Sequence, residues 1–177
     1  MLPVLLIVLC VILRIAPHPP NFAPVGATAV FAGRTLHPLF AVLVVGVAMV
    51  AGDVFLARLH GYAAFDWVTP FIYGSFFLQL LAGRMLRQRR GGMIIAALAG
   101  SLGFFVLSNL GVFIASGMYA HSAAGLAACY LAALPFLGRT ILGDILWTLI
   151  LMAAYRPLAA RLEARRGFVP IPLHEMA

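Results

Sequence analysis

Long uninterrupted apolar runs, separated by short polar or proline-rich segments, dominate the sequence. They cover residues 2–16, 22–33, 36–57, 67–86, 92–115, 122–134 and 140–158. Runs of about 20 apolar residues are typical of helices that cross a bilayer, whereas a transmembrane barrel would alternate apolar and polar positions in segments of about 10 residues. The pattern therefore predicts an all-α integral membrane protein. Run 22–33 would rise only about 20 Å as a helix, against a roughly 30 Å apolar core, so it predicts a short tilted helix or a re-entrant segment.

The apolar stretch from 122 to 158 carries two interruptions. Pro135 cannot donate a helical hydrogen bond, and Gly138 and an arginine follow three residues later. These residues predict a division into a short helix over 122–134 and a full span over 140–158.

Arginine clusters suggest how the runs are oriented. One cluster lies over residues 84–90, between two runs, and a second lies over 156–166, after the last run. Because positive charge collects on the cytoplasmic side of membrane proteins, we expect both clusters there. Segment 122–134 should then lie at the outer surface, which gives a six-transmembrane-helix bundle with both termini cytoplasmic. In the alternative, 22–33 does not cross and 122–134 does, which conflicts with one cluster.

Composition agrees with a membrane protein and excludes several other classes. Only 10% of the residues are charged and 64% are hydrophobic, whereas soluble domains carry about 25% charged residues. The balance of 12 arginines and 5 acids gives a net charge of +7. Because the arginines flank apolar runs, we expect the lipid bilayer as their partner and no nucleic acid. We expect one transmembrane helical domain over 1–160 and a polar cytoplasmic tail over 161–177.

Polar side chains inside apolar runs are costly, so each needs a partner or a function. With the orientation above, most of them fall in the outer halves of the spans, which predicts a pocket that opens outward above an apolar floor. The candidate binding residues are Asn21, Phe22, Asp53, Tyr73, Ser75, Asn109, Tyr119, His121, Arg139 and Asp144. In the structural alternative these groups pair with one another, Asp53 with Arg58 and Asp144 with Arg139. The sequence contains no P-loop and no HExxH, CxxC or GxSxG motif.

The segment from Pro17 to Gly83 resembles the substrate-binding S components of energy-coupling factor (ECF) vitamin transporters, closest to the cobalamin or corrinoid subgroup. The resemblance rests on Pro20-Asn21-Phe22-Ala23-Pro24-Val25-Gly26-Ala27, Phe31-Ala32-Gly33-Arg34, His37-Pro38-Leu39, Gly52-Asp53, Tyr73-Gly74-Ser75-Phe76 and Gly83-Arg84. S components commonly carry an Ala-xxx-Ala docking motif in their first helix. The first run here has none, and Ala23/Ala27 is the nearest candidate.

The resemblance implies a subunit of the bacterial cytoplasmic (inner) membrane that captures a vitamin from outside. Its partners would be a membrane scaffold protein and two ATPase subunits, which would supply the energy. The implied ligand is cobalamin or a related corrinoid, bound as cargo; the protein would carry no cofactor of its own.

The cobalamin subgroup is associated with a membrane-helix cysteine that binds cobalt. Cys10 and Cys129 do not fall in the polar outer half of a main span, whereas Ser75 does. We therefore expect the cobalt of a bound corrinoid near Ser75, His18 or His121. Thiol-driven chemistry on it should be absent or feeble, because a hydroxyl is a far weaker cobalt donor than a soft thiolate. Two rival functions remain: a small membrane enzyme that uses Asp53, Asp144 and a histidine as acid–base groups, and a structural or assembly subunit that binds no ligand.

Overall fold

The computed structural model describes residues 2–166, with side chains described as far as residue 160, and the remainder of the predicted tail lies outside this range. The described chain forms six α-helices joined by short loops, which confirms the all-α prediction. The helices are α1 (Leu2–Ile15), α2 (Val25–Thr35), α3 (Pro38–His60), α4 (Thr69–Met85), α5 (Gly92–Ala115) and α6 (Ala123–Arg166).

Local sequence signals explain where several helices begin and end. Pro38 begins α3, where its missing N–H costs nothing, and Gly61 ends it with φ +74°, a conformation that glycine adopts without strain. Before α4, the carboxylate of Asp66 accepts the N–H groups of Val68 and Thr69, both at 2.9 Å. The N–H of Asp66 in turn donates to Thr69 Oγ1 at 2.9 Å. This reciprocal pair fixes the entry to α4.

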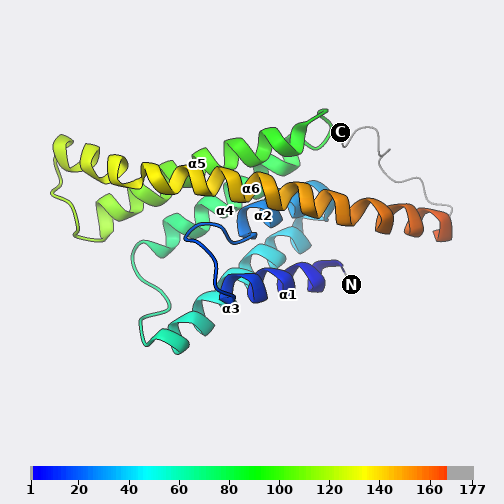
Figure 1. Ribbon diagram of the computed structural model, residues 1–177, viewed down its shortest axis with the longest axis horizontal. Helices are drawn as coiled ribbons and strands as arrows, with labels where there is room; N and C mark the ends of the chain where they lie inside the picture. The colour runs from blue at the N-terminus through cyan, green and yellow to red at the C-terminus, as the bar shows by residue number, and fades with distance from the viewer. Residues whose placement is uncertain (1, 167–177) are drawn as a thin grey trace.

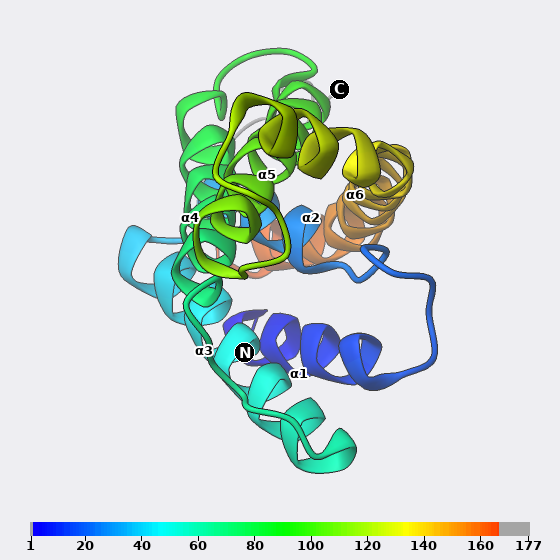
Figure 2. The ribbon, with the colours of Figure 1, turned by 90° about the vertical axis from the view of Figure 1, so that its left-hand side faces the viewer.

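The helices form two groups with α2 between them. Helices α1 and α3 pack together on one side, while α4, α5 and α6 pack in sequence on the other (Figure 2). Helix α2 contacts all five of the others. Figure 1 shows the N-terminus, the loop between α4 and α5 and the end of α6 at one end of the molecule. The α3–α4 and α5–α6 loops lie at the opposite end, so the arginine-rich segments share one end, as the predicted topology requires.

Helix α2 is enclosed by protein on every side. All residues from Val25 to Arg34 are buried, which is the position expected for a short helix without a polar face. Two glycines bring α2 and α4 into backbone contact: a Cβ at Gly33 would collide with the carbonyl oxygen of Leu80, and a Cβ at Gly83 would collide with that of Val30. The predicted segment 22–33 is thus a short helix, and neighbouring helices cover it.

Three of the described helices are long and apolar enough to cross a membrane: α3, α5 and α6 over Ala123–Ala160. Helix α1 is a shorter apolar helix, and α2 and α4 have 11 and 17 residues. The structure therefore supports six helices with three candidate spans, which indicate a multi-pass membrane protein, and it does not establish the predicted six-span bundle. Many large apolar side chains point outward from these helices, among them Phe40, Val47, Leu102 and Leu142, as expected for a lipid-facing surface.

The predicted division of segment 122–158 is wrong, because α6 is one continuous helix of 44 residues with Pro135 and Pro157 inside it. Figure 1 shows it running along the whole length of the molecule beside α5. At 1.5 Å per residue the helix is about 66 Å long, which exceeds the apolar thickness of a bilayer. A proline removes a single donor, whereas ending the helix in an apolar environment would leave several backbone groups unpaired. Continuity is therefore the less costly arrangement.

Candidate functional site

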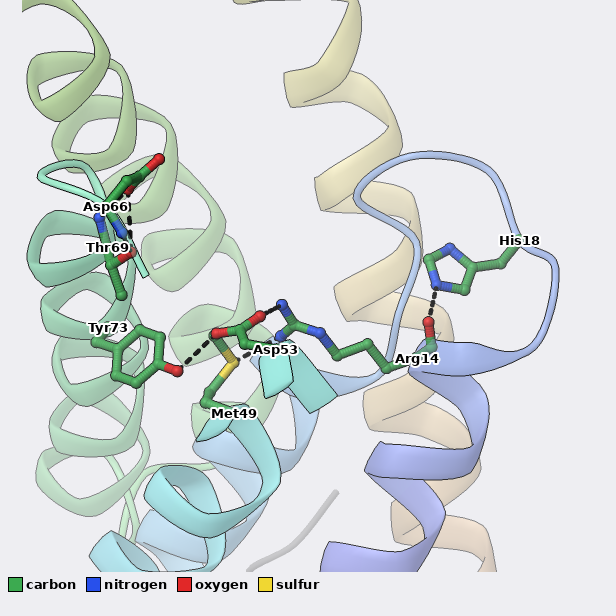
Figure 3. Close-up of polar contacts among 7 residues, drawn as sticks. All are labelled: Arg14, His18, Met49, Asp53, Asp66, Thr69 and Tyr73. Atoms are coloured by element: carbon green, nitrogen blue, oxygen red, sulfur yellow. Dashed lines mark hydrogen bonds and ion pairs between the residues drawn. The ribbon is translucent and has the colours of Figure 1, made fainter. Parts of the chain in front are cut away.

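An ion pair joins the first and third helices at the C-terminal end of α1. The guanidinium of Arg14 contacts the carboxylate of Asp53 and also donates to Met49 Sδ at 2.8 Å. The hydroxyl of Tyr73, on α4, donates to the other carboxylate oxygen of Asp53 at 2.6 Å. Figure 3 shows Asp53 held between Arg14 and Tyr73. One carboxylate therefore links three helices. The structural alternative paired Asp53 with Arg58, whereas the structure pairs it with Arg14.

The loop between α1 and α2 is held against two helices. His18 lies with Nε2 3.2 Å from the carbonyl oxygen of Arg14, close to the end of α1 (Figure 3). Trp147, on α6, donates its indole N–H to the carbonyl oxygen of Phe22 at 2.8 Å. Gly143 leaves space on α6 for this loop, because a Cβ there would lie 3.3 Å from Phe22 Cα. These contacts fix the loop across the start of α2.

A cavity of about 280 Å³ lies beneath this loop, at the N-terminal end of α2. Its polar lining comes from three helices and the loop and consists of Arg14, His18, Asn21, Gln79, Thr140 and Asp144. Apolar side chains complete the wall, including Leu56, Ile72, Phe76 and Phe104. A mostly apolar cavity with a few converging polar groups is the usual form of a small-molecule site.

Two buried polar side chains converge over Gly26, in the first turn of α2. Asp144, on α6, is 4% exposed. It accepts the hydroxyl of Ser101 at 2.7 Å and the backbone N–H of Ala27. Gln79, on α4, is 1% exposed. A Cβ at Gly26 would meet both Asp144 Oδ1 and Gln79 Oε1. Glycine at this position therefore lets two side chains reach the start of α2, where the helix dipole favours a carboxylate.

A second cavity of about 210 Å³ adjoins the first and extends between α4, α5 and α6. It shares Asn21, Phe104 and Thr140 with the larger cavity and is also lined by Asn109. The amide of Asn109 donates to the carbonyl oxygen of Phe105 at 2.7 Å. The structure thus brings Asn21, Asp144 and Asn109, three of the predicted binding residues, into adjoining cavities.

The seven other predicted binding residues line neither cavity. Phe22, Asp53 and Tyr73 make the contacts described above, and the remaining four lie elsewhere. Ser75 is buried and donates to the carbonyl oxygen of Ile72 at 2.6 Å. Tyr119 and His121 belong to the α5–α6 loop, where His121 Nε2 lies 3.1 Å from the carbonyl oxygen of Phe113. Arg139 is exposed. It lies about 140° around the helix axis from Asp144, so the two predicted pairing partners face different surroundings.

Gln79 and Arg14 were not among the predicted binding residues, although both line the larger cavity. Gln79 was visible as a polar residue within an apolar run, but its position along the run indicated the cytoplasmic half. Arg14 ends the first run and indicated only a helix boundary. Within the described residues, no group of three or more His, Cys, Asp and Glu side chains lies close enough together to hold a metal ion.

Comparison of the sequence with known protein families gives one match. A model described as "Family of unknown function (DUF6580)" matches residues 1–165, nearly the whole chain. No curated protein and no solved structure matches the sequence.

Proposed function

Because the chain belongs to the DUF6580 family, whose function is unknown, its activity must be inferred from its own site, and we propose that it is the solute-binding membrane subunit of an uptake system. The solute would be a vitamin-class small molecule. As in the S components that the sequence resembles, a separate membrane scaffold with two ATPase subunits would energise transport.

The observation that carries this proposal is the cavity at the start of α2. Nearly all buried polar groups in native proteins are paired, so an unpaired group that also lines a cavity supports a binding role. Gln79 lines the cavity, and its side-chain amide has no hydrogen-bond partner among the described residues. The loop that carries Asn21 covers one side of the cavity, and the apolar cluster around Phe31 and Met49 lies along α2 and α3. Solute would enter from the side of this loop.

The enzyme alternative is less well supported by the same geometry. It needs Asp53, Asp144 and a histidine to act together on a substrate, with the groups close together around one reactive point. Asp53 is engaged by Arg14 and Tyr73, while Asp144 is held by Ser101 and the start of α2. Both carboxylates therefore have partners that favour fixed positions over proton transfer.

Cobalamin is the specific solute that the sequence resemblance implies. Of the three residues predicted near its cobalt, His18 lines the larger cavity, whereas Ser75 bonds the carbonyl oxygen of Ile72. A corrinoid is much larger than a cavity of about 280 Å³, so the loop and helices around His18 would have to separate to admit it. The cavity as it stands favours a smaller vitamin.

Calorimetry with the detergent-purified chain tests the proposal. The panel would contain biotin, riboflavin, thiamine, nicotinamide and cobalamin. We expect saturable binding of one member, lost in Asp144→Asn and retained in Asp66→Asn, a matched change of an exposed aspartate outside the cavity. Absence of binding by every member would refute the assignment, and binding that survives Asp144→Asn would move the site elsewhere. A red purified sample would support cobalamin directly.

A further inference from the structure

The side-chain amide of Gln79 is the polar group that the fold leaves unused at the cavity. The residue is 1% exposed, and neither Nε2 nor Oε1 has a hydrogen-bond partner within the described part of the chain. Leaving a buried donor and acceptor unpaired costs stability. A polar group that is kept under this cost, and that lines a cavity, is a candidate for binding a ligand.

Glycines on two other helices make room for this amide. A Cβ at Gly100, on α5, would lie 2.7 Å from Gln79 Cγ and 3.1 Å from its Cδ. A Cβ at Gly26, on α2, would lie 2.5 Å from Gln79 Oε1. In proteins a Cβ atom essentially never lies within 3.0 Å of a non-bonded heavy atom. A larger residue at either position would therefore displace the glutamine side chain. Three helices therefore cooperate to direct one amide into the cavity.

The groups around Gln79 define what the amide could bind. Asp144 reaches the same point over Gly26 and presents a carboxylate. Phe76 and Phe104 also line the cavity, and their ring centroids are 5.2 Å apart. The wall therefore combines a group that both donates and accepts, a second acceptor with negative charge, and an aromatic surface.

We propose that Gln79 pairs with an amide-type edge of a small planar ring solute, in which an N–H donor and a C=O acceptor lie side by side. Carboxamides, lactams and cyclic ureides carry such an edge, and its complement is another amide. Asp144 would accept a further N–H and disfavour solutes with a carboxylate at that position. This inference rests on the proposed function and names the substrate class of the same cavity.

Paired probes test the inference on the wild-type protein. Nicotinamide is compared with nicotinic acid, which lacks the amide donor, and riboflavin with its N3-methyl derivative, in which a methyl group blocks the imide donor. We expect the affinity for at least one amide probe to exceed that for its counterpart by about tenfold or more. A ratio of this size corresponds to the loss of a pair of hydrogen bonds. This comparison requires no variant to fold.

Gln79→Leu and Thr148→Val then separate binding from stability. Thr148 is also fully buried, its hydroxyl has no partner among the described residues, and it does not line the cavity. We expect both variants to melt at or above the wild-type temperature without added probe, because each removes an unpaired polar group. Only Gln79→Leu should weaken binding of the amide probe, by about tenfold or more.

The outcomes distinguish this inference from the proposed function. Equal affinity for both members of each probe pair, or undiminished binding by Gln79→Leu, overturns the role of Gln79 and leaves a solute-binding subunit in place. No binding by any vitamin or amide probe to the wild-type protein counts against both. If Gln79→Leu melts well below Thr148→Val, the glutamine has a structural role and the inference fails.

Discussion

The close approach of α2 and α4 gives the sharpest prediction about stability. Gly83→Ala would place a methyl group against the carbonyl oxygen of Val30. Because the obstacle is backbone, no side chain can rotate to relieve the collision, and the two helices must move apart. Gly46→Ala is the matched control, since a Cβ at that helical position meets nothing within 4 Å.

The expected magnitude follows from two opposing effects. Inserting a methyl group into a packed interface costs about 1–3 kcal/mol. At an unobstructed helix position, alanine is about 1 kcal/mol more favourable than glycine. Both glycines lie within helices, so this gain applies to both variants and cancels between them. The free energies of unfolding of Gly83→Ala and Gly46→Ala should therefore differ by the steric cost of about 1–3 kcal/mol, with Gly46→Ala the more stable.

Denaturation by SDS in mixed micelles, followed by tryptophan fluorescence, measures this difference. Trp147 is a suitable reporter because it packs against the core that contains α2. Gly33→Ala, which collides with the carbonyl oxygen of Leu80, should be similarly destabilising. The double variant should lose less than the sum, because a single separation of the helices relieves both collisions. Equal stability of Gly83→Ala and Gly46→Ala would refute the backbone contact.

Three further predictions concern the ion-pair network, the cavity and the topology. Tyr73→Phe removes the hydroxyl that donates to Asp53 at 2.6 Å and should cost about 1–2 kcal/mol in the same denaturation assay; an unchanged midpoint would refute this contact. Gly26→Ala should abolish solute binding in calorimetry, because its methyl group meets both polar side chains over α2; wild-type affinity would contradict the geometry. An impermeant maleimide should label Tyr62→Cys on intact spheroplasts and Gln88→Cys only after permeabilisation, and the reverse pattern would invert the proposed orientation.

The helical organisation was largely predictable because apolar runs and their boundaries are local properties. Run 92–115 coincides with α5, and run 2–16 with α1 to within one residue. The continuity of α6 was not predictable from Pro135 alone. The cost of a proline inside a helix depends on its surroundings. In an apolar environment, ending the helix would leave more backbone groups without hydrogen bonds than the proline does, so an unbroken helix is favoured.

The candidate site was predictable in its residue types and only partly in its contacts. Asp144 was predicted as a binding residue because it is a charged residue inside an apolar run, and it does line the cavity. Asp53 pairs with Arg14, 39 positions away along the chain, and no local pattern specifies such a pairing. Gln79 was left out of the predicted site because its position along the run indicated the cytoplasmic half. Helix α2 begins near the middle of the molecule (Figure 1), so the polar site at its start extends as far as Gln79.

The enclosure of α2 also has a consequence for biogenesis. This helix has only 11 residues and emerges from the ribosome before four of the five helices that surround it. On its own it is too short to remain stably across a bilayer. Helix α2 can reach its final position only after α4, α5 and α6 have been synthesised. The N-terminal helices should therefore complete their insertion only when the C-terminal helices are present. A nascent chain halted after α3 would leave α2 exposed to quality-control proteases.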